Sequence, residues 1–236
     1  MTTALVTGAA QGLGRAIARR LAADGHQLVV LDLNAEGAEE TAALVGGRAV
    51  ECDVTDRAAL ASVAAEVGPI DVLINNAGIW RFGPILEASA EDLEDVVRVN
   101  LLGTVNACQA FTPTMGPGSS IVNFSSAAAA IRAPGVGIYT ASKGALEVLT
   151  QQLAGELGPR GIRVNAIAPG LIVTEGTAVN YQAGRQEERA KTVPLRRVGE
   201  PADIANVVSF LVSDQASYVT GQIVAVDGGI AAARVS

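Results

Sequence analysis

Tyr139 and Lys143 stand four residues apart in the stretch "GIYTASKGALEVLT", residues 137–150. If this stretch forms a helix, the two side chains lie on the same face, one turn apart. The chain has only three tyrosines and two lysines, so chance would produce this spacing on the order of 0.03 times. An ammonium group beside a phenol favours the phenolate, which suits general acid–base catalysis. We therefore predict that this pair transfers protons.

A glycine-rich stretch, "VTGAAQGLG", follows the first apolar run and precedes an alanine-rich helical segment. Its glycines, Gly8, Gly12 and Gly14, permit a tight turn and close approach of the backbone to a pyrophosphate. In a chain with 26 glycines, the spacing of these three is by itself weak evidence for a nucleotide-binding loop. The strand–turn–helix context makes it a predicted dinucleotide-binding loop.

The second apolar run ends at Asp32. A carboxylate at this position can accept hydrogen bonds from the ribose hydroxyls of an adenosine and would repel a 2′-phosphate. Leu33 and Asn34, which follow, offer no positive charge for such a phosphate. The sequence therefore favours NAD over NADP as cofactor.

Short apolar or β-branched runs recur along the chain, at residues 3–7, 27–32, 48–52, 71–75, 120–124, 162–168 and 222–227. Most are continuous rather than alternating, which is typical of parallel strands buried on both faces. Helical stretches at 14–25, 56–68 and 89–111 lie between them. We predict an α/β fold: a single Rossmann-like domain over residues 1–236, with a doubly wound parallel sheet of about seven strands and helices on both faces.

Residues 171–200 interrupt this alternation with charged residues, glycines and a proline after a predicted strand. An insertion beyond the carboxyl end of a strand in such a fold is where a substrate lid would lie. We predict a lid within this segment.

The net charge of −7 and the absence of a basic run argue against a nucleic-acid or membrane-surface partner. Cys52 and Cys108 form no CxxC and are expected to be buried thiols. A single histidine excludes a multi-histidine metal site, and we predict no metal. The first residues lack the basic start and long apolar core of a signal peptide, and no apolar run approaches the ~18 residues of a membrane span. We expect a soluble, cytoplasmic protein.

Several short motifs occur in a familiar order: "TGAAQGLG" 7–14, "CDVTD" 52–56, "NNAG" 75–78, "VN" 99–100, "SS" 125–126, "YTASK" 139–143, "PG" 169–170 and "VDGG" 226–229. Over essentially its whole length the chain resembles the short-chain dehydrogenase/reductase family. The resemblance implies an NAD-dependent oxidoreductase that interconverts a secondary alcohol and a ketone by hydride transfer. The positive charge of oxidised nicotinamide would join the lysine in favouring the phenolate.

The resemblance also implies four catalytic residues. Tyr139 would be the general acid/base, and Ser126 would hydrogen-bond the same substrate oxygen. We choose Ser126 over Ser125 by its spacing to Tyr139. Lys143 would bind the nicotinamide ribose, and Asn100 would hold a water that links Lys143 to solvent.

A larger set of cofactor contacts is implied in the same way: Gly8, Gln11, Gly12, Leu13, Gly14, Asp32, Leu33, Asp53, Val54, Asn76, Ala77, Gly78, Tyr139, Lys143, Pro169, Gly170, Ile172 and Thr174. Residues 53–54 would line the adenine, residues 76–78 would pass under the ribose, and residues 169–174 would hold the nicotinamide. Asn75 and Asn123 are expected to be structural.

The substrate pocket is expected to be walled mainly by apolar side chains, from Trp80, Phe82, residues 127–138, Leu171, Val173 and Tyr181. Such a pocket favours a small, uncharged, apolar ketone or secondary alcohol. Trp80 and Phe82 could instead pack under a helix or in a subunit contact. Arg81 or Arg132 would change the preference if either pointed inward.

One alternative within the family is reduction of a 3-oxoacyl group on an acyl carrier protein. Such carriers are acidic and need a basic docking surface. The loop 112–120, which we place near the cleft, has no lysine or arginine, and Arg160 and Arg163 are the only basic residues beside it. With the net charge of −7, this favours a small free substrate.

A second alternative, from another class, is a non-catalytic dinucleotide-binding protein; the presence of Tyr139, Lys143 and Ser126 argues against it. By analogy with the family we expect a homotetramer or a homodimer, formed through the helices that contain Asn100 and Tyr139 and through the last strand.

Overall fold

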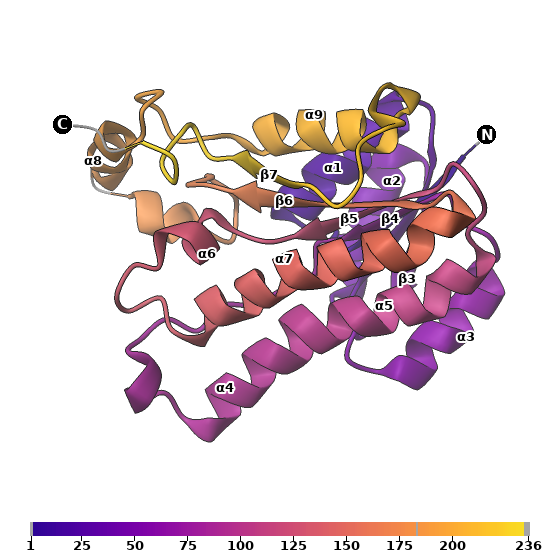
Figure 1. Ribbon diagram of the computed structural model, residues 1–236, viewed down its shortest axis with the longest axis horizontal. Coiled ribbons are helices and arrows are strands. Elements are labelled where there is room, and N and C mark those ends of the chain that lie inside the picture. Colours follow the sequence, from indigo (N-terminus) through magenta and orange to yellow (C-terminus); the bar gives the residue numbers. More distant parts are fainter. Residues whose placement is uncertain (1, 183, 234–236) are drawn as a thin grey trace.

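The computed structural model describes residues 2–182 and 184–233, and a parallel sheet of seven strands runs through its middle (Figure 1). The strands are β1 (Thr3–Thr7), β2 (Gln27–Asp32), β3 (Arg48–Glu51), β4 (Val72–Asn75), β5 (Ser120–Phe124), β6 (Arg163–Pro169) and β7 (Ile223–Val226). They lie in the order β3-β2-β1-β4-β5-β6-β7. The predicted doubly wound α/β fold is confirmed, and each predicted run overlaps an observed strand.

Helices cover both faces of the sheet. On one face lie α1 (Gly12–Ala23), α2 (Ala35–Val45) and α9 (Pro201–Val212); on the other lie α3 (Arg57–Val67), α4 (Ala90–Val97), α5 (Gly103–Phe111) and α7 (Ile138–Leu157). In β1, Ala4 and Val6 belong to the first core, whereas Leu5 between them belongs to the second. The strands are continuously apolar because both of their faces are buried.

The predicted helix 89–111 is not one regular α-helix. Ser89 caps its start by accepting a hydrogen bond from the Asp92 amide at 3.1 Å. Between α4 and α5, however, residues Arg98–Leu102 form a π-helical turn, although the two helices make one rod in Figure 1. Such turns insert an extra residue and are frequent at functional sites. Here the turn contains Asn100.

The loop before α7 requires glycine. Gly137 precedes the helix with φ of +68°, and a Cβ on it would lie 2.9 Å from the Gly83 carbonyl oxygen. The Gly83 amide in turn donates to the Gly135 carbonyl at 2.7 Å. The loops that follow β4 and β5 are thereby held together where α7 begins.

The remaining short elements are α6 (Ala127–Ile131), α8 (Arg185–Thr192) and the 3-10 turns Ile85–Glu87, Thr112–Thr114, Gly158–Arg160, Ala178–Tyr181 and Asp214–Ala216. Helices α6 and α8 stand at the same end of the molecule, beyond the carboxyl ends of the strands (Figure 1). Of these elements, α6, α8 and the turn Ala178–Tyr181 contribute residues to the site described below.

Cys52 and Cys108 are buried and free. Among residues 2–182 and 184–233, no group of three or more His, Cys, Asp or Glu side chains is arranged to hold a metal ion. Over the same residues, no helix combines the length and apolar character needed to cross a membrane.

Candidate active site

A cleft of about 1010 Å³ opens along the carboxyl ends of the strands. It begins where β1 and β4 lie side by side and the strand order reverses, the usual place for a ligand in such sheets. All of the predicted catalytic and cofactor-binding residues line this cleft except Gly14 and Asn100, which lie behind it. Of the predicted pocket walls, Trp80, Phe82, Leu171 and Tyr181 line it, whereas Val173 does not.

Gly14 serves the packing of α1. A Cβ on it would lie 2.1 Å from the Gly8 carbonyl oxygen and 2.7 Å from the Ala9 Cα. Both are backbone atoms, which cannot move aside cheaply. Glycine here lets the start of α1 lie directly against the loop that follows β1.

Asn100 is fully buried and holds the loop after β4 in place. Its Oδ1 accepts from the Ile79 amide at 2.8 Å, and its Nδ2 donates to the Ile79 carbonyl at 2.9 Å and to Ser142 Oγ at 3.1 Å. Its carbonyl oxygen accepts the Thr104 hydroxyl at 2.9 Å. These contacts give Asn100 a positioning role, and the water that the resemblance implies there stays a prediction.

Lys143 is only 5% exposed, and its ammonium group donates to the Phe124 carbonyl oxygen at 2.7 Å. The same nitrogen lies 5.7 Å from the centroid of the Tyr139 ring. Burial lowers the pKa of Lys143 to about 8, because a charged ammonium loses most of its hydration there. The end of β5 and the first turns of α7 thus place the predicted pair together in the cleft.

Tyr139 does not have the lowered pKa that the sequence suggested. Burial raises the pKa of its phenol, and a hydrogen bond with the Ser126 side chain opposes that rise. The Lys143 ammonium, 5.7 Å from the ring centroid, does not outweigh that rise. In the free protein burial dominates, so the second positive charge, that of oxidised nicotinamide, is needed to favour the phenolate.

The two neighbouring serines have different partners. Ser125 is buried, and its hydroxyl lies 2.7 Å from the Glu147 carboxylate and 3.1 Å from the Lys143 carbonyl oxygen. Ser126 caps α6 by accepting from the Ala128 amide at 3.2 Å, and it lines the cleft. In the free protein its hydroxyl is hydrogen-bonded with the Tyr139 phenol, the group expected to share the substrate oxygen with it, which supports the choice of Ser126.

Asp32 ends β2 at the edge of the cleft. Its carboxylate accepts from the amides of Ala10 and Asn34, each at 2.9 Å. The neighbouring Leu33 is 66% exposed. The nearby Arg15 already pairs with Glu40 at 2.9 Å, so it offers little to a 2′-phosphate. This arrangement supports the predicted preference for a ribose with free hydroxyls.

The start of α1 already binds an anionic group. Its N-cap, Gln11, makes no side-chain hydrogen bond to the helix. Instead the Glu175 carboxylate, from the segment 171–200, accepts from the Gly12 amide at 2.9 Å. A carboxylate at this helix start occupies the position that a pyrophosphate would take, so the donors fit a dinucleotide.

Gly78 leaves a second space that such a cofactor requires. A Cβ on it would come within 3.1 Å of Asn100 Oδ1 and 3.5 Å of the Lys143 ammonium. Without a side chain, the backbone passes close to Lys143 and leaves room beside it. The residues predicted to lie under the ribose therefore fit that group.

The far part of the cleft is mainly apolar. Trp80, Phe82 and Tyr181 line it, and the Phe82 ring meets the Tyr139 ring edge-on with centroids 6.1 Å apart. Arg81 does not line the cleft, because it pairs with Asp92 at 3.1 Å. Arg132 does not line it either, and it is exposed.

Arg189 of α8 does line the cleft, although no pattern in the sequence singles it out. Its guanidinium stacks over Tyr181, with 5.0 Å between the guanidinium carbon and the ring centroid. No local motif surrounds it. The contact depends on how the segment 171–200 folds back over the cleft.

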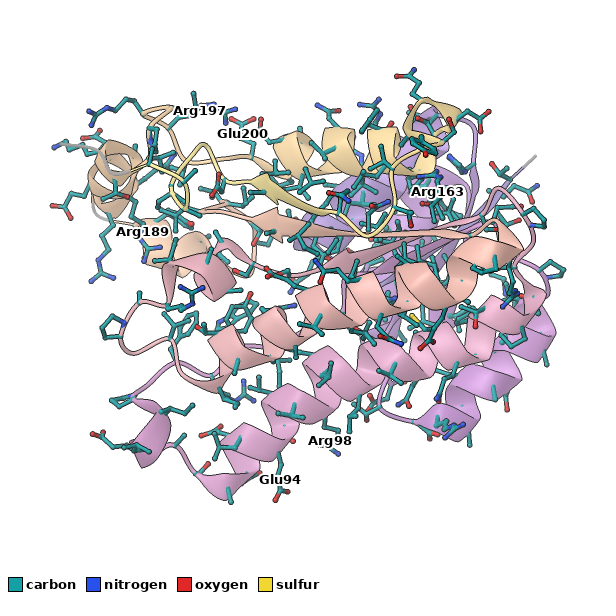
Figure 2. The ribbon with its side chains drawn as sticks, viewed as in Figure 1. Glu94, Arg98, Arg163, Arg189, Arg197 and Glu200 are labelled. Carbon is teal, nitrogen blue, oxygen red and sulfur yellow. The ribbon has the colours of Figure 1, made fainter. Side chains whose placement is uncertain are left out.

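The predicted position of the loop 112–120 is wrong. This loop leads into the start of β5, whereas the cleft lies beyond the ends of the strands. Arg160 and Arg163 are used there to bind backbone carbonyls, such as that of Thr112 and that of Leu211. Figure 2 shows Arg163 and Arg189 toward opposite ends of the molecule. The charge of this loop therefore says little about what docks at the cleft.

Comparison with known proteins agrees with this geometry. The family model described as "Enoyl-(Acyl carrier protein) reductase" matches residues 8–231. The D-threitol dehydrogenase of Mycolicibacterium smegmatis is 41% identical over 96% of this chain and 91% of its own. A 3-oxoacyl-(acyl-carrier-protein) reductase of Staphylococcus aureus is 39% identical over 97% of both chains.

Two solved structures are similar throughout. A short-chain dehydrogenase/reductase of Brucella melitensis superposes with a TM-score of 0.92 at 37% identity, covering 97% of this chain and 96% of that one. This chain belongs to the short-chain dehydrogenase/reductase family. A blue fluorescent protein from a metagenomic library, in complex with NADPH, matches with a TM-score of 0.89 at 38% identity over 98% of both chains.

As a short-chain dehydrogenase/reductase, the protein is an oxidoreductase that acts on carbonyl or alcohol substrates, and its family uses NAD or NADP. The relatives include both a sugar-alcohol dehydrogenase and a carrier-protein reductase. The family therefore defines the chemistry more closely than it defines the substrate.

The buried Lys143 should reduce the stability of this short-chain dehydrogenase/reductase near neutral pH. At pH 7 the folded and unfolded forms are both protonated, so the full cost of burial applies. Above about pH 8 the folded form loses its proton, whereas the unfolded form keeps it up to about 10.5. Relative to a Lys143→Met variant, wild-type stability should therefore rise with pH between these values.

Urea unfolding of the protein without cofactor tests this. Lys143→Met should raise the free energy of unfolding by about 1–3 kcal/mol at pH 7, with a smaller difference at pH 9.5. Lys191→Met, which removes the exposed second lysine, is the control and should change stability little at either pH. If the difference in unfolding free energy between wild type and Lys143→Met did not depend on pH, Lys143 would not have a lowered pKa in the folded protein.

The Glu175 contact predicts an effect on cofactor affinity. The pyrophosphate predicted to bind at the Gly12 amide would compete with the Glu175 carboxylate, which accepts from that amide and would repel it. Glu175→Gln should lower the dissociation constant of NADH roughly two- to fivefold, as expected for one charge at a helix start. NADH fluorescence titration measures this, with Glu187→Gln, an exposed glutamate of α8, as the charge-matched control. Equal NADH affinities in wild type, Glu175→Gln and Glu187→Gln would show that Glu175 does not compete with the cofactor.

Proposed function

We propose that this protein is an NAD-dependent short-chain alcohol dehydrogenase or carbonyl reductase that interconverts a small, mainly apolar secondary alcohol and its ketone. The observation that carries the proposal is the placement of Tyr139, Ser126 and Lys143 in one cleft with the Asp32 carboxylate. We further propose a single domain over residues 1–236, with the segment 171–200 as a substrate lid.

Each side chain has one task in this reaction. The bound nicotinamide supplies the hydride acceptor or donor. During reduction the Tyr139 hydroxyl gives its proton to the substrate oxygen, and during oxidation it takes that proton back. Ser126 donates a hydrogen bond to the same oxygen. Lys143 holds the nicotinamide ribose, and Asn100 keeps the adjoining loop and the predicted water in place.

The cleft walls limit water around the reacting groups. Phe82 packs edge-on against Tyr139, and Trp80 lines the same side. Electrostatic interactions strengthen where water is excluded, so the charges near the phenol act more strongly on its proton. This favours a substrate whose reacting carbon carries apolar neighbours.

We also propose a cytoplasmic homotetramer or homodimer without nucleic-acid or membrane partners. Leu102, in the π-helical turn, is 49% exposed, and Val148, on α7, is 66% exposed. Exposed apolar side chains on these elements support contacts between copies through them.

A second candidate is reduction of a 3-oxoacyl group on an acyl carrier protein, favoured by the Staphylococcus aureus relative. The acidic chain, with a net charge of −7, disfavours an acidic carrier. Much faster reduction of a carrier-bound 3-oxoacyl group than of small free ketones would replace our proposal with this one.

Replacement of the general acid/base tests the proposed chemistry. Tyr139→Phe should reduce kcat for secondary alcohols between roughly a hundred- and ten-thousandfold, because proton transfer is lost while the ring is kept. Its NADH dissociation constant should stay within about twofold of wild type. Tyr218→Phe, at a fully exposed tyrosine, is the control and should retain activity. Full turnover by Tyr139→Phe would eliminate the assigned role.

The cofactor preference is tested at the end of β2. Asp32→Ala combined with Leu33→Arg should lower kcat/KM for NAD and raise it for NADP, each by roughly tenfold, because a charge-assisted phosphate contact replaces the ribose contact. Asp32→Ala alone should lose the NAD preference without the full gain for NADP. A wild-type protein that already prefers NADP in steady-state kinetics would overturn the proposal.

A further inference from the structure

Arg189 differs from the other charged residues of the cleft. The charged side chains that line it are Asp32, Asp53, Asp95, Arg98, Lys143 and Arg189. Asp32 ends β2 and Asp53 follows the neighbouring strand β3, at the predicted adenosine end. Arg98 pairs with Asp95 at 2.6 Å and, in Figure 2, lies at the outer edge of the helical layer.

Arg189 forms no ion pair with any residue of 2–182 or 184–233. It is partly buried, and the ring beneath its guanidinium, Tyr181, is only 9% exposed. Its neighbours on α8, Glu187 and Glu188, are exposed to solvent. A guanidinium is always charged, and such a group is seldom withdrawn from water without a partner.

The contact with Tyr181 leaves most of the guanidinium unused. The guanidinium carbon lies 5.0 Å from the centroid of the Tyr181 ring. The guanidinium has five N–H donors in its plane, arranged as a fork that matches the two oxygens of a carboxylate. The tyrosine ring therefore holds the fork in one orientation without saturating it.

Many of the other side chains that line the cleft are apolar. Trp80, Phe82, Ile131 and Val136 line it together with Tyr181. A single monovalent cation in such surroundings balances one negative charge, whereas a phosphate dianion would keep an unpaired charge. The geometry therefore favours a carboxylate at the end of an apolar chain.

We propose that Arg189 is a specificity-determining residue that binds a carboxylate of the substrate. The substrate class is then a hydroxy acid, and its oxo-acid product, in which an apolar chain separates the reacting carbon from the carboxylate. The alcohol carbon loses a hydride to NAD and its oxygen loses a proton to Tyr139, while the carboxylate is unchanged. This inference rests on the proposed function.

Kinetics on matched acids and esters test the proposal. The probes are 3-hydroxybutanoate, 5-hydroxyhexanoate and 7-hydroxyoctanoate, each beside its methyl ester. Wild type should prefer at least one acid over its ester. Arg189→Gln should lower kcat/KM for that acid roughly ten- to a hundredfold, as expected for a lost charge-assisted contact, and change the ester by less than threefold. Arg189→Lys should restore part of the loss.

Arg185→Gln, which removes an exposed arginine one turn earlier on α8, is the control and should leave both substrates unchanged. Equal losses for acid and ester in Arg189→Gln would assign Arg189 to lid packing alone and overturn the proposal. A wild-type preference for every ester would overturn it as well.

A binding measurement keeps the proposal testable without turnover. Trp80 is the only tryptophan of the chain and lines the cleft, so its fluorescence reports occupancy. With NADH bound, butanoate, hexanoate and octanoate are compared with their amides. At least one carboxylate should bind more tightly than its amide, and Arg189→Gln should remove the difference. Equal affinities for every pair would refute the inference.

The two proposals fail in different ways. If carboxylates bind through Arg189 but no acid, ester or simple secondary alcohol is oxidised with NAD, the proposed function fails and the binding inference stands. If esters and simple alcohols are oxidised but carboxylates bind no better than amides, the inference fails and the proposed function stands.

Discussion

The rest of the site depends on a buried ammonium group, that of Lys143, held by the Phe124 carbonyl oxygen at 2.7 Å. A buried charge with few partners is costly, so its surroundings must be rigid. Asn123 of β5 donates to the Thr150 hydroxyl of α7 at 2.9 Å and accepts from Asn75 of β4 at the same distance. The polar side chains of these strands therefore fix α7 against the sheet, where its second turn carries the lysine.

The need to hold the buried Lys143 ammonium in rigid surroundings also explains the irregular backbone around the cleft. Asn100 can reach the Ile79 amide and carbonyl because the helical rod α4–α5 changes to a π-turn at that residue. Gly78 beside it has no Cβ, so the loop after β4 lies close to Lys143. Departures from regular structure are concentrated where the chain must bring polar groups close to one cation. Elsewhere, apolar packing on both faces of the sheet is sufficient.

The contrast between regular apolar strands and the irregular polar segments around the cleft determines what the sequence could predict. The strands at residues 3–7, 27–32 and 120–124 were located correctly because burial on both faces makes them continuously apolar. The pairing of Tyr139 with Lys143 follows from helical spacing alone. The π-turn, the Glu175 contact with Gly12 and the position of Arg189 depend on contacts between segments far apart in the chain. No local pattern records them, and for the same reason the loop 112–120 was placed at the wrong edge.

The segment 171–200 contains both Glu175 and Arg189. Through Glu175 it occupies a donor at the start of α1, and through Arg189 it presents a cation at the substrate end of the cleft. Tyr181 and α8 follow Glu175 on this segment. On the proposed function, one segment thus connects cofactor binding with the shape of the substrate site.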